Sequence, residues 1–533
     1  MPEPTLSRRM SAEDAAFLYF EKPDAPLHIG SLGIFEGAID FGQLYASIDA
    51  RMHLIPRYRQ MPVIPPFYAG HPTWEDDTKF SLERHMRHVR MPAPGTDLQL
   101  RELCSELFEP MLARDRPLWD IIMIYGLEGD RTAMLSRVHH CLVDGVSGVE
   151  LLLALLDLVP NPEPTPQPAE PWQPKARPTP WESWADATFE AWTRGLRNVT
   201  EFQQNLLDPR GQMRRMTDLA HAFEVALPAA LRQPPKAIWN KPVSGKRRVA
   251  WSEMSFQEVR RIRSAIGGTV NDVMLTLLGG ALGRYLQTRG QKVDGTAVRM
   301  MIPVNVRSED QKGALGNRVS MMLPDIPLGI ADPVARLQAV RQEMQRLKDE
   351  SQANAFEALA GLSENIPAAL HAMAGINGVP PGGANMVCTN VPGPMIPLWS
   401  VGHRLLASYP MLPLAGDLGI GAGIMSFNKS LYFGIMSDPT IIGDVDLIAQ
   451  YLDDEFRALR EAAGVPESDL PDIGAPVRST NGNGHSTNGH APAHEPPPAP
   501  LASQPEPEPR AAQPEPEPQP METEPAEEPI PAP

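Results

Sequence analysis

The chain has 533 residues, of which 59 are proline, and 48 basic against 65 acidic side chains give it a formal charge of −17. This balance gives no electrostatic support for general nucleic-acid binding. Three cysteines at unrelated spacings (Cys104, Cys141 and Cys388) exclude a disulfide framework and a four-cysteine metal site. No run of about 20 apolar residues predicts a membrane span, and the start lacks the apolar stretch of a signal peptide. We expect a cytoplasmic chain that can still make peripheral contact with a membrane.

The first third of the chain predicts a helix, a hairpin and a second helix. Residues 102–112 carry leucine and methionine at four-residue spacing, which indicates a helix. Residues 119–127 are rich in isoleucine and predict a strand, residues 128–130 (EGD) a turn, and residues 132–140 the returning strand. A helix is then predicted over residues 146–158.

Two stretches of biased composition interrupt this pattern. Nine of the 21 positions from 160 to 180 are proline, which predicts a semi-rigid extended linker. The last 63 residues, from Pro471, hold 18 prolines and ten acids. Such a segment buries too little apolar surface to offset its ordering entropy, so we expect it to be disordered.

The second half alternates strands with helices. No tandem repeat of 20–50 residues is found by inspection. Helices are predicted over 271–286, 333–348 and 445–460, and strands over 298–303, 319–323, 386–389, 420–426 and 430–436. Strands and helices intermixed through both halves predict an α/β architecture.

The segment 139–145 (HHCLVDG) is the sharpest chemical feature. His139 and His140 end a predicted strand, and Asp144 and Gly145 open a predicted helix. Because successive strand side chains face opposite ways, we expect one histidine to point at a substrate cleft and the other to support it. An imidazole with a pKa of about 6.5 can act as a general base at neutral pH.

The same segment has other interpretations. A histidine pair can simply be packed or exposed. Two adjacent histidines cannot easily face one ion, and no His-Glu-x-x-His or Cys-x-x-Cys motif adds ligands, so no metal is expected. The apolar residues after Cys141 favour a buried cysteine over a thiol nucleophile. A serine hydrolase is poorly supported, because Gly-x-Ser-x-Gly is absent.

The HHxxxDG segment resembles the active-site signature of the CoA-dependent acyltransferase superfamily. Further segments are similar to the bacterial bifunctional wax ester synthase/diacylglycerol acyltransferase family: 10–17 (MSAEDAAF), 26–30 (PLHIG), 117–119 (PLW), 271–272 (ND), 303–307 (PVNVR), 315–318 (LGNR) and 389–394 (TNVPGP). The similarity runs from about residue 6 to residue 460, and several motifs in order make it specific.

The resemblance implies two chloramphenicol-acetyltransferase-like α/β domains with the active-site tunnel between them. With the two biased stretches it predicts five parts, which are an N-terminal acyltransferase domain (1–159), the Pro-rich linker (160–180), a basic helical crossover (181–245), a C-terminal acyltransferase domain (246–470) and a disordered Pro/Glu-rich tail (471–533).

The resemblance also assigns chemistry. His140 would be the general base that takes the proton of an acceptor hydroxyl, which attacks the acyl-CoA thioester without a covalent acyl-enzyme, and His139 would support it. Asp144 would hold the local backbone through an arginine that the sequence does not identify. Gly145 would leave room where backbone and substrate approach closely.

Four further residues have two interpretations each. Asn271 and Asp272 could lie near the tunnel or simply cap the helix that starts there. Thr389 and Asn390 could bring a hydroxyl or amide near a developing oxyanion, or they could belong to a turn shaped by Pro and Gly. We expect Trp119 to pack in the core.

The middle of the chain is basic. Residues 194–248 hold eleven basic and four acidic side chains, and Trp181, Trp184, Trp192 and Leu196 recur at helical spacing just before or within this stretch. An aromatic-faced helix with basic neighbours suits docking on an anionic membrane or lipid droplet. The alternative is a crossover packed on the domains with a solvated basic face. On the first interpretation, the basic face would include Arg247 and Arg248.

The sequence thus predicts an O-acyltransferase that moves a long fatty acyl group from acyl-CoA, its substrate, to diacylglycerol or a long-chain alcohol, with no cofactor and no nucleic-acid partner. One alternative is a condensation or polyketide-associated acyltransferase that uses a carrier-protein thioester. Another is a non-catalytic lipid-binding scaffold, for which the imidazole beside Asp144 and Gly145 would have no use.

Overall fold

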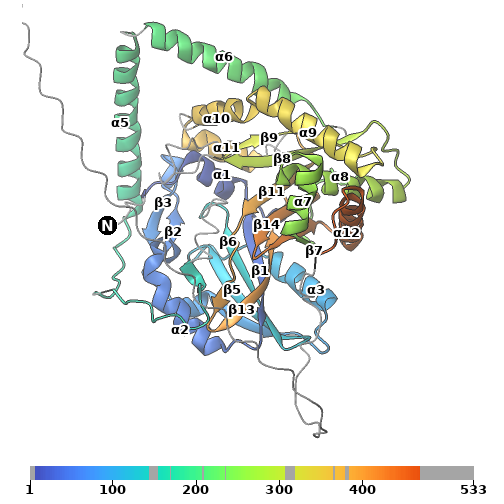
Figure 1. Ribbon diagram of the computed structural model, residues 1–533. Coiled ribbons are helices and arrows are strands. Elements are labelled where there is room, and N and C mark those ends of the chain that lie inside the picture. The colour runs from blue at the N-terminus through green and yellow to red at the C-terminus, as the bar shows by residue number, and fades with distance from the viewer. Residues whose placement is uncertain are drawn as a thin grey trace, which may run out of the picture. The chain divides into compact units, whose positions relative to one another are not determined.

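The computed structural model describes residues 7–142, 154–168, 170–206, 209–234, 236–305, 319–363, 366–377 and 383–468. These described residues belong to one compact unit (Figure 1). The predicted disordered tail (471–533) and most of the helix predicted over residues 146–158 lie outside the described residues.

The first sheet has six strands. Its order is β12 (Trp399–Ser400), β13 (His403–Met411), β1 (His28–Glu36), β6 (Arg131–His139), β5 (Trp119–Leu127) and β4 (Met86–Arg90). The predicted hairpin is confirmed, since β5 and β6 pair antiparallel. Its turn places Gly129 and Asp130 at φ of 79° and 51°, a region that glycine and aspartate tolerate. Trp119 is buried as predicted, and its indole donates to the Tyr58 carbonyl oxygen at 2.8 Å.

The second sheet has seven strands. Its order is β10 (Asp325–Pro327), β8 (Ala297–Asn305), β11 (Met386–Pro392), β14 (Ile420–Phe427), β15 (Ser430–Ser437) and β7 (Arg248–Ser255), and β9 (Val319–Met322) also pairs with β8. All five strands predicted in this half are present, whereas β7 and β10 were not predicted. β8, β11 and β14 run parallel. A small antiparallel pair, β2 (Gln60–Val63) and β3 (Thr73–Asp76), stands apart.

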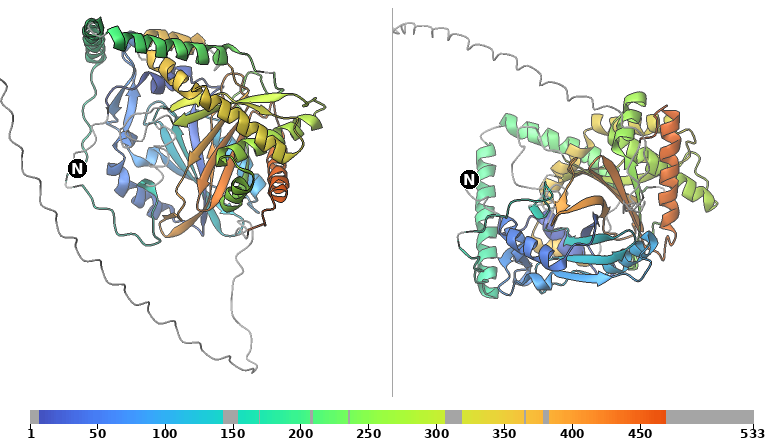
Figure 2. Two further views of the ribbon diagram at one scale, coloured as in Figure 1. Left: turned by 45° about the horizontal axis from the view of Figure 1, so that its top comes forward. Right: turned by 60° about the horizontal axis from the view of Figure 1, so that its bottom comes forward.

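The chain crosses from the second half into the first sheet. β13 pairs antiparallel with β1, although the two strands are separated by more than 360 residues. Tyr409 on β13 stacks on Trp251 of β7 at 4.9 Å and meets Tyr432 of β15 edge-on at 5.3 Å. Figure 2 shows the C-terminal strands (orange) beside the N-terminal ones (blue and cyan). The two sheets therefore share a core at this crossing strand.

Helices cover both sheets. In chain order they are α1 (Ala12–Phe20), α2 (Phe41–Arg51), α3 (Asp97–Phe108), α5 (Pro180–Leu206), α6 (Pro209–Leu231), α7 (Phe256–Ile266), α8 (Val270–Thr288), α9 (Pro333–Asp349), α10 (Gln352–Ser363), α11 (Ala368–Asn377) and α12 (Val445–Ala462). Short 3-10 turns are η1 (Met52–Leu54), η2 (Pro56–Arg59), η3 (Pro66–Tyr68) and η4 (Leu82–Arg84).

The helix predicted over 102–112 begins and ends earlier than expected. Thr96 caps α3 by accepting the Gln99 backbone N–H, and the Gln99 side chain accepts the Thr96 backbone N–H in return. This Thr-x-x-Gln box is a readable start signal. The helix ends before Pro110, because a proline ring obstructs the preceding turn. The predicted range, 102–112, began after the capping box and continued through Pro110.

α8 is the central buried helix of the second half. Fourteen of its 19 residues are buried, and its apolar side chains fill the core under the second sheet. Among the described residues, no one helix has the length and apolar character of a membrane span, although the bent pair α7–α8 meets those two criteria jointly.

The basic crossover contains two long helices, α5 and α6, seen along the left and upper edges of Figure 1. α6 packs on α10. Two arginines of the predicted basic face have other roles. Arg247 is 3% exposed and donates to the Leu414 and Asp24 carbonyl oxygens, and Arg248 pairs with Asp446 at 3.1 Å. These contacts connect β7 to its neighbours, so they argue against a place for Arg247 and Arg248 on a lipid-docking basic face.

The Pro-rich stretch has no helix or strand among its described residues up to 179. It is anchored on the N-terminal part by several contacts, including those of Lys175 and Trp172. The Lys175 backbone N–H donates to the Asp76 carboxylate at 2.9 Å, and the Arg59 guanidinium lies 4.9 Å from the centre of the Trp172 ring. These contacts tie the stretch to β3 and η2.

Candidate active site

The histidine pair lies where β6 ends. His139 is the last residue of the strand and faces His28 of β1 in the register. His139 is fully buried, whereas His140 is partly exposed. Since consecutive residues at a strand end project to opposite sides, the two imidazoles occupy different environments.

The His139 ring is held by a hydrogen bond on one nitrogen and faces a carboxylate with the other. Its Nδ1 accepts the Cys141 backbone N–H at 3.2 Å, so the proton of the neutral ring is on Nε2. Nε2 lies 3.4 Å from Oε1 of Glu21. Burial lowers the pKa of His139, and the neighbouring Glu21 carboxylate opposes this. The ring is therefore neutral at pH 7, and its Nε2 faces the Glu21 carboxylate without a direct hydrogen bond.

Glu21, directly after α1, is a buried carboxylate with three partners. Its side chain is 1% exposed, and it pairs with Arg114 as well as facing His139. Oε1 also accepts the Leu27 backbone N–H at 2.8 Å. Burial by itself would raise the pKa of Glu21, but His139, Arg114 and the Leu27 N–H together lower it to about 2. The group is thus a fixed negative charge behind the histidine pair.

His140 is positioned by its backbone and by its ring face. Its backbone N–H donates to the Leu27 carbonyl oxygen at 3.0 Å. Its ring stacks on Phe17 of α1 with centroids 3.9 Å apart and 9° between the planes. A partly exposed imidazole at a strand end, held in one rotamer, has the placement that a general base needs.

His28 is a third histidine beside the pair, because it lies opposite His139 where β1 pairs with β6. It is fully buried, and its Nε2 donates to the Phe108 carbonyl oxygen at 2.9 Å. Burial and the charge of Arg137 lower its pKa to about 3. His28 is therefore a neutral packing partner of His139 and not a base.

Cys141 follows the pair and is buried, as predicted. Burial raises the pKa of its thiol well above the ordinary value. A thiol held protonated in this way is a poor nucleophile. Asp144 and Gly145 lie outside the described residues.

Of the four predicted residues of the second half, two are in contact with each other. The Asn390 side chain on β11 donates to Oδ1 of Asn271 at 3.3 Å. Asp272 closes a capping box with Thr269 at the start of α8, so it acts as a helix cap. Thr389 is partly exposed and pairs with Gly423 of β14 in the register. The structure thus brings Asn271 and Asn390 together.

Sequence reasoning missed the supporting residues. Glu21 and Phe17 lie four residues apart, a spacing that places both on one side of α1 and its C-terminal end. That spacing was the available signal, but nothing local connects α1 to residues 139–140. Among the described residues, no group of three or more His, Cys, Asp or Glu side chains is placed to hold a metal ion.

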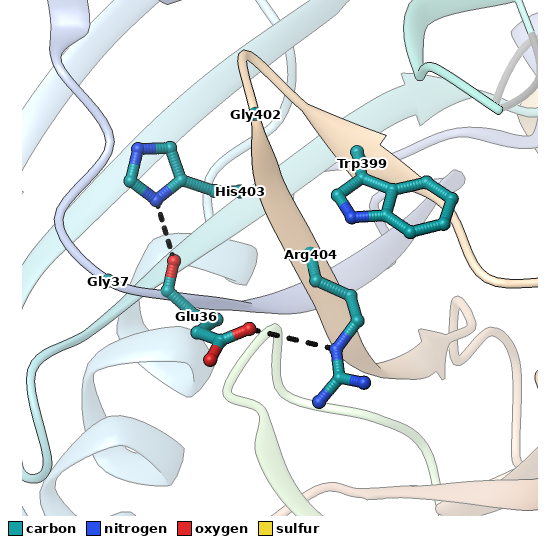
Figure 3. A pocket seen from close by; sticks show the side chains of 6 residues that line it. All are labelled: Glu36, Gly37, Trp399, Gly402, His403 and Arg404. Atoms are coloured by element: carbon teal, nitrogen blue, oxygen red, sulfur yellow. Dashed lines mark hydrogen bonds and ion pairs between the residues drawn. The ribbon is translucent and has the colours of Figure 1, made fainter. Parts of the chain in front are cut away.

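The structure also has a shallow depression, whose lining is drawn in Figure 3. Its volume is about 490 Å³, and it is lined by Glu36, Gly37, Trp399, Gly402, His403 and Arg404. Glu36 and His28 stand at opposite ends of β1, which at 3.3 Å per residue separates them by about 26 Å. The depression is thus separate from the histidine site.

Comparison of the chain with known proteins identifies its family. The wax ester synthase/diacylglycerol acyltransferase catalytic domain matches residues 10–274, and the C-terminal domain of the same family matches residues 315–460. A protein of Mycobacterium tuberculosis named "probable diacylglycerol O-acyltransferase" is 30% identical over 454 residues, which cover 84% of this chain and 94% of that protein.

Two solved structures share the fold. The wax ester synthase/diacylglycerol acyltransferase from Marinobacter aquaeolei VT8 has a TM-score of 0.59 and 22% identity, and covers 86% of this chain and 100% of its own. The first condensation domain of the calcium-dependent antibiotic synthetase has a TM-score of 0.52 and 16% identity, over 87% of this chain and 98% of its own. The predicted α/β fold of two sheet-rich halves is confirmed. The chain belongs to the wax ester synthase/diacylglycerol acyltransferase family and is an acyltransferase.

Proposed function

We propose that the chain transfers a long-chain fatty acyl group from acyl-CoA to diacylglycerol or a long-chain alcohol, with His140 as the general base. The observation that supports this is the division of roles in the histidine pair. His139 is buried, with its Nδ1 on a backbone N–H and its Nε2 toward Glu21. His140 is partly exposed at the strand end and is held by Phe17.

In the proposed reaction the His140 imidazole takes up one proton and later gives it back. A neutral His140 nitrogen takes the hydroxyl proton of the acceptor while the oxygen attacks the thioester carbonyl. The tetrahedral intermediate collapses, the carbon–sulfur bond breaks, and the ester is formed. The CoA thiolate then receives the proton from the imidazolium, which restores the neutral base. The buried thiol of Cys141, with its raised pKa, argues against a covalent acyl-enzyme on that residue.

The amide pair near β11 has a proposed role in the same step. Asn271 and Asn390 contact each other at 3.3 Å, so each orients the other. We propose that this pair, with Thr389, offers polar groups to the acyl carbonyl or to the acceptor. Preorganised donors of this kind stabilise a developing oxyanion.

The acyl transfer is tested by supplying purified protein with labelled palmitoyl-CoA. Diacylglycerol and hexadecanol are offered in parallel, and the products are separated by thin-layer chromatography. We expect labelled triacylglycerol, wax ester or both. Turnover only when the acyl group is supplied as a carrier-protein thioester would contradict the proposal in favour of a condensation-type enzyme.

We also propose that α5 contacts a lipid surface, at the inner membrane face or on lipid inclusions. Trp181, Phe189 and Trp192 are 71%, 64% and 62% exposed on this helix. The other side of α5 is docked on the protein, with Ala187 buried and Glu190 paired with Arg9. Aromatic side chains on the free face of an amphipathic helix favour the boundary between lipid headgroups and acyl chains.

Liposome flotation tests this contact. The triple variant Trp181→Ser, Phe189→Ser and Trp192→Ser is expected to lose binding to vesicles that contain anionic lipid. The matched control replaces three exposed apolar residues elsewhere, Leu54, Leu98 and Ile396, by serine and is expected to float as the parent does. Unchanged flotation of the α5 variant would contradict the proposal.

A further inference from the structure

We propose that Glu21 is a positioning residue for His140, acting through the Leu27 peptide and the His139 ring without touching substrate. The proposal rests on the acyl transfer and on the role of His140 proposed above. It assigns to the end of α1 a task in the reaction that the HHxxxDG segment alone does not contain.

The first link runs through the backbone. Oε1 of Glu21 accepts the Leu27 N–H at 2.8 Å, and the carbonyl oxygen of Leu27 accepts the His140 N–H at 3.0 Å. The chain turns tightly between Glu21 and Leu27. In this turn the Lys22 N–H donates to the Ala25 carbonyl oxygen at 3.3 Å, and the Ala25 N–H donates to the Lys22 carbonyl oxygen at 2.9 Å. The carboxylate and the His140 N–H thus bind the two peptide units on either side of the Leu27 Cα, so Glu21 fixes the residue that holds the backbone of His140.

The second link runs through the neighbouring ring. Oε1 of Glu21 lies 3.4 Å from Nε2 of His139, and the Cys141 N–H donates to Nδ1 of the same ring. Cys141 and His139 flank His140 on both sides in the chain. A fixed His139 ring therefore fixes the peptide units on either side of the proposed base.

The charge on Glu21 strengthens both links. Hydrogen bonds to an ionised acceptor are roughly twice as strong as those between neutral groups. Arg114 pairs with the other carboxylate oxygen, so the negative charge is balanced although the side chain is only 1% exposed. Removal of the carboxylate would leave the buried Leu27 N–H without its acceptor and would take away the charge that His139 Nε2 faces.

A positioning role predicts a specific kinetic effect. Displacement of a catalytic group by about 1 Å can cost on the order of 100-fold in rate. Within the described part of the chain, the Glu21 carboxylate contacts Leu27, His139 and Arg114. Because none of these is a proposed substrate contact, loss of Glu21 should lower kcat with little change in KM. A residue that touched the acyl chain or acceptor would instead change KM.

The chain offers a matched control in Glu258. It is also buried, accepts a backbone N–H from Ser468 at 2.7 Å, and pairs with Arg460 at 3.3 Å. It stands on α7 in the core of the second half. Its removal should therefore destabilise the fold in a comparable way without reaching the histidine pair.

The experiment measures kcat and KM for acyl-CoA in Glu21→Ala, Glu21→Gln, Glu258→Ala and His140→Ala, with folding checked by circular dichroism. We expect a 10- to 100-fold lower kcat in Glu21→Ala at a KM within threefold of the parent. Glu21→Gln keeps one acceptor oxygen and should recover part of this loss. Glu258→Ala should keep kcat within twofold per folded molecule.

Several outcomes would overturn the proposal. They are a kcat within twofold of the parent in Glu21→Ala, an effect on KM alone, or an equal loss in Glu258→Ala. If Glu21→Ala does not fold, the test rests on kcat of Glu21→Gln. We expect this kcat to be at least fivefold lower than that of the parent, and a smaller decrease would refute the role. Absence of turnover in the parent, or full turnover in His140→Ala, would instead refute the proposed function.

Discussion

Replacement of Phe17 by leucine removes the ring that stacks on His140. The two rings lie 3.9 Å apart and nearly parallel, and Phe17 stands on α1, whose first turn is capped by Ser11. An aromatic pair of this kind contributes about 0.5–1.5 kcal/mol beyond the area it buries. We take this as the energy that keeps the imidazole in its stacked rotamer.

The expected kinetic loss follows from that energy. If the unstacked rotamers are unproductive, the competent fraction of molecules decreases by the same factor. At about 1.4 kcal/mol per tenfold, kcat should decrease about two- to twelvefold in Phe17→Leu. KM for acyl-CoA should stay within about twofold, because the change acts on the base and not on substrate contacts.

The assay follows CoA release with a thiol reagent. Phe17→Tyr keeps the aromatic face and should retain kcat. Leu18→Ala, at a buried neighbour on the same helix, controls for lost packing and should destabilise the fold by about 2–5 kcal/mol without changing kcat. A kcat unchanged in Phe17→Leu, or lowered more than 100-fold, would refute this account of the stacking.

Three further outcomes are expected. Burial and the charge of Arg137 lower the pKa of His28 to about 3 in the folded chain. Between about pH 6.5 and pH 3, His28 therefore binds a proton in the unfolded chain but stays neutral in the folded chain. The free energy of urea unfolding should therefore decrease as the pH falls from 6.5 toward 3, and His28→Asn should have a shallower slope. Cys141, buried with a raised thiol pKa, should resist iodoacetamide at pH 8 until urea unfolds the chain, and Cys141→Ala should keep turnover; rapid labelling of the native protein would contradict its placement. For Asn271→Ala and Asn390→Ala, a double-mutant cycle on stability should give a coupling of about 0.5–1.5 kcal/mol, and additive effects would refute their contact.

The sequence predicted those helices and strands that are specified by residues close together in the chain. The isoleucine-rich run and the turn at 128–130 predicted β5 and β6, and the apolar run after the Gly-Gly pair predicted α8. The early start of α3 was also readable, because the capping box of Thr96 and Gln99 spans only four residues. In these cases the side chains that decide the structure are neighbours in the chain.

Long-range pairings were not predictable in the same way. Nothing within residues 403–411 indicates that β13 joins the first sheet beside β1. Glu21 acts on His139 across 118 positions of sequence, and Arg247 is buried by residues as distant as Leu414. An ion pair or a buried arginine is specified by its partners, and these are brought together only by the complete fold.

The most direct test of the central claim is the turnover of His140→Ala. Loss of a general base typically costs about 10²–10⁴-fold, so kcat for acyl transfer from palmitoyl-CoA should decrease by at least 100-fold while the circular dichroism spectrum and KM stay near those of the parent. A folded His140→Ala protein with kcat within tenfold of the parent would contradict the account.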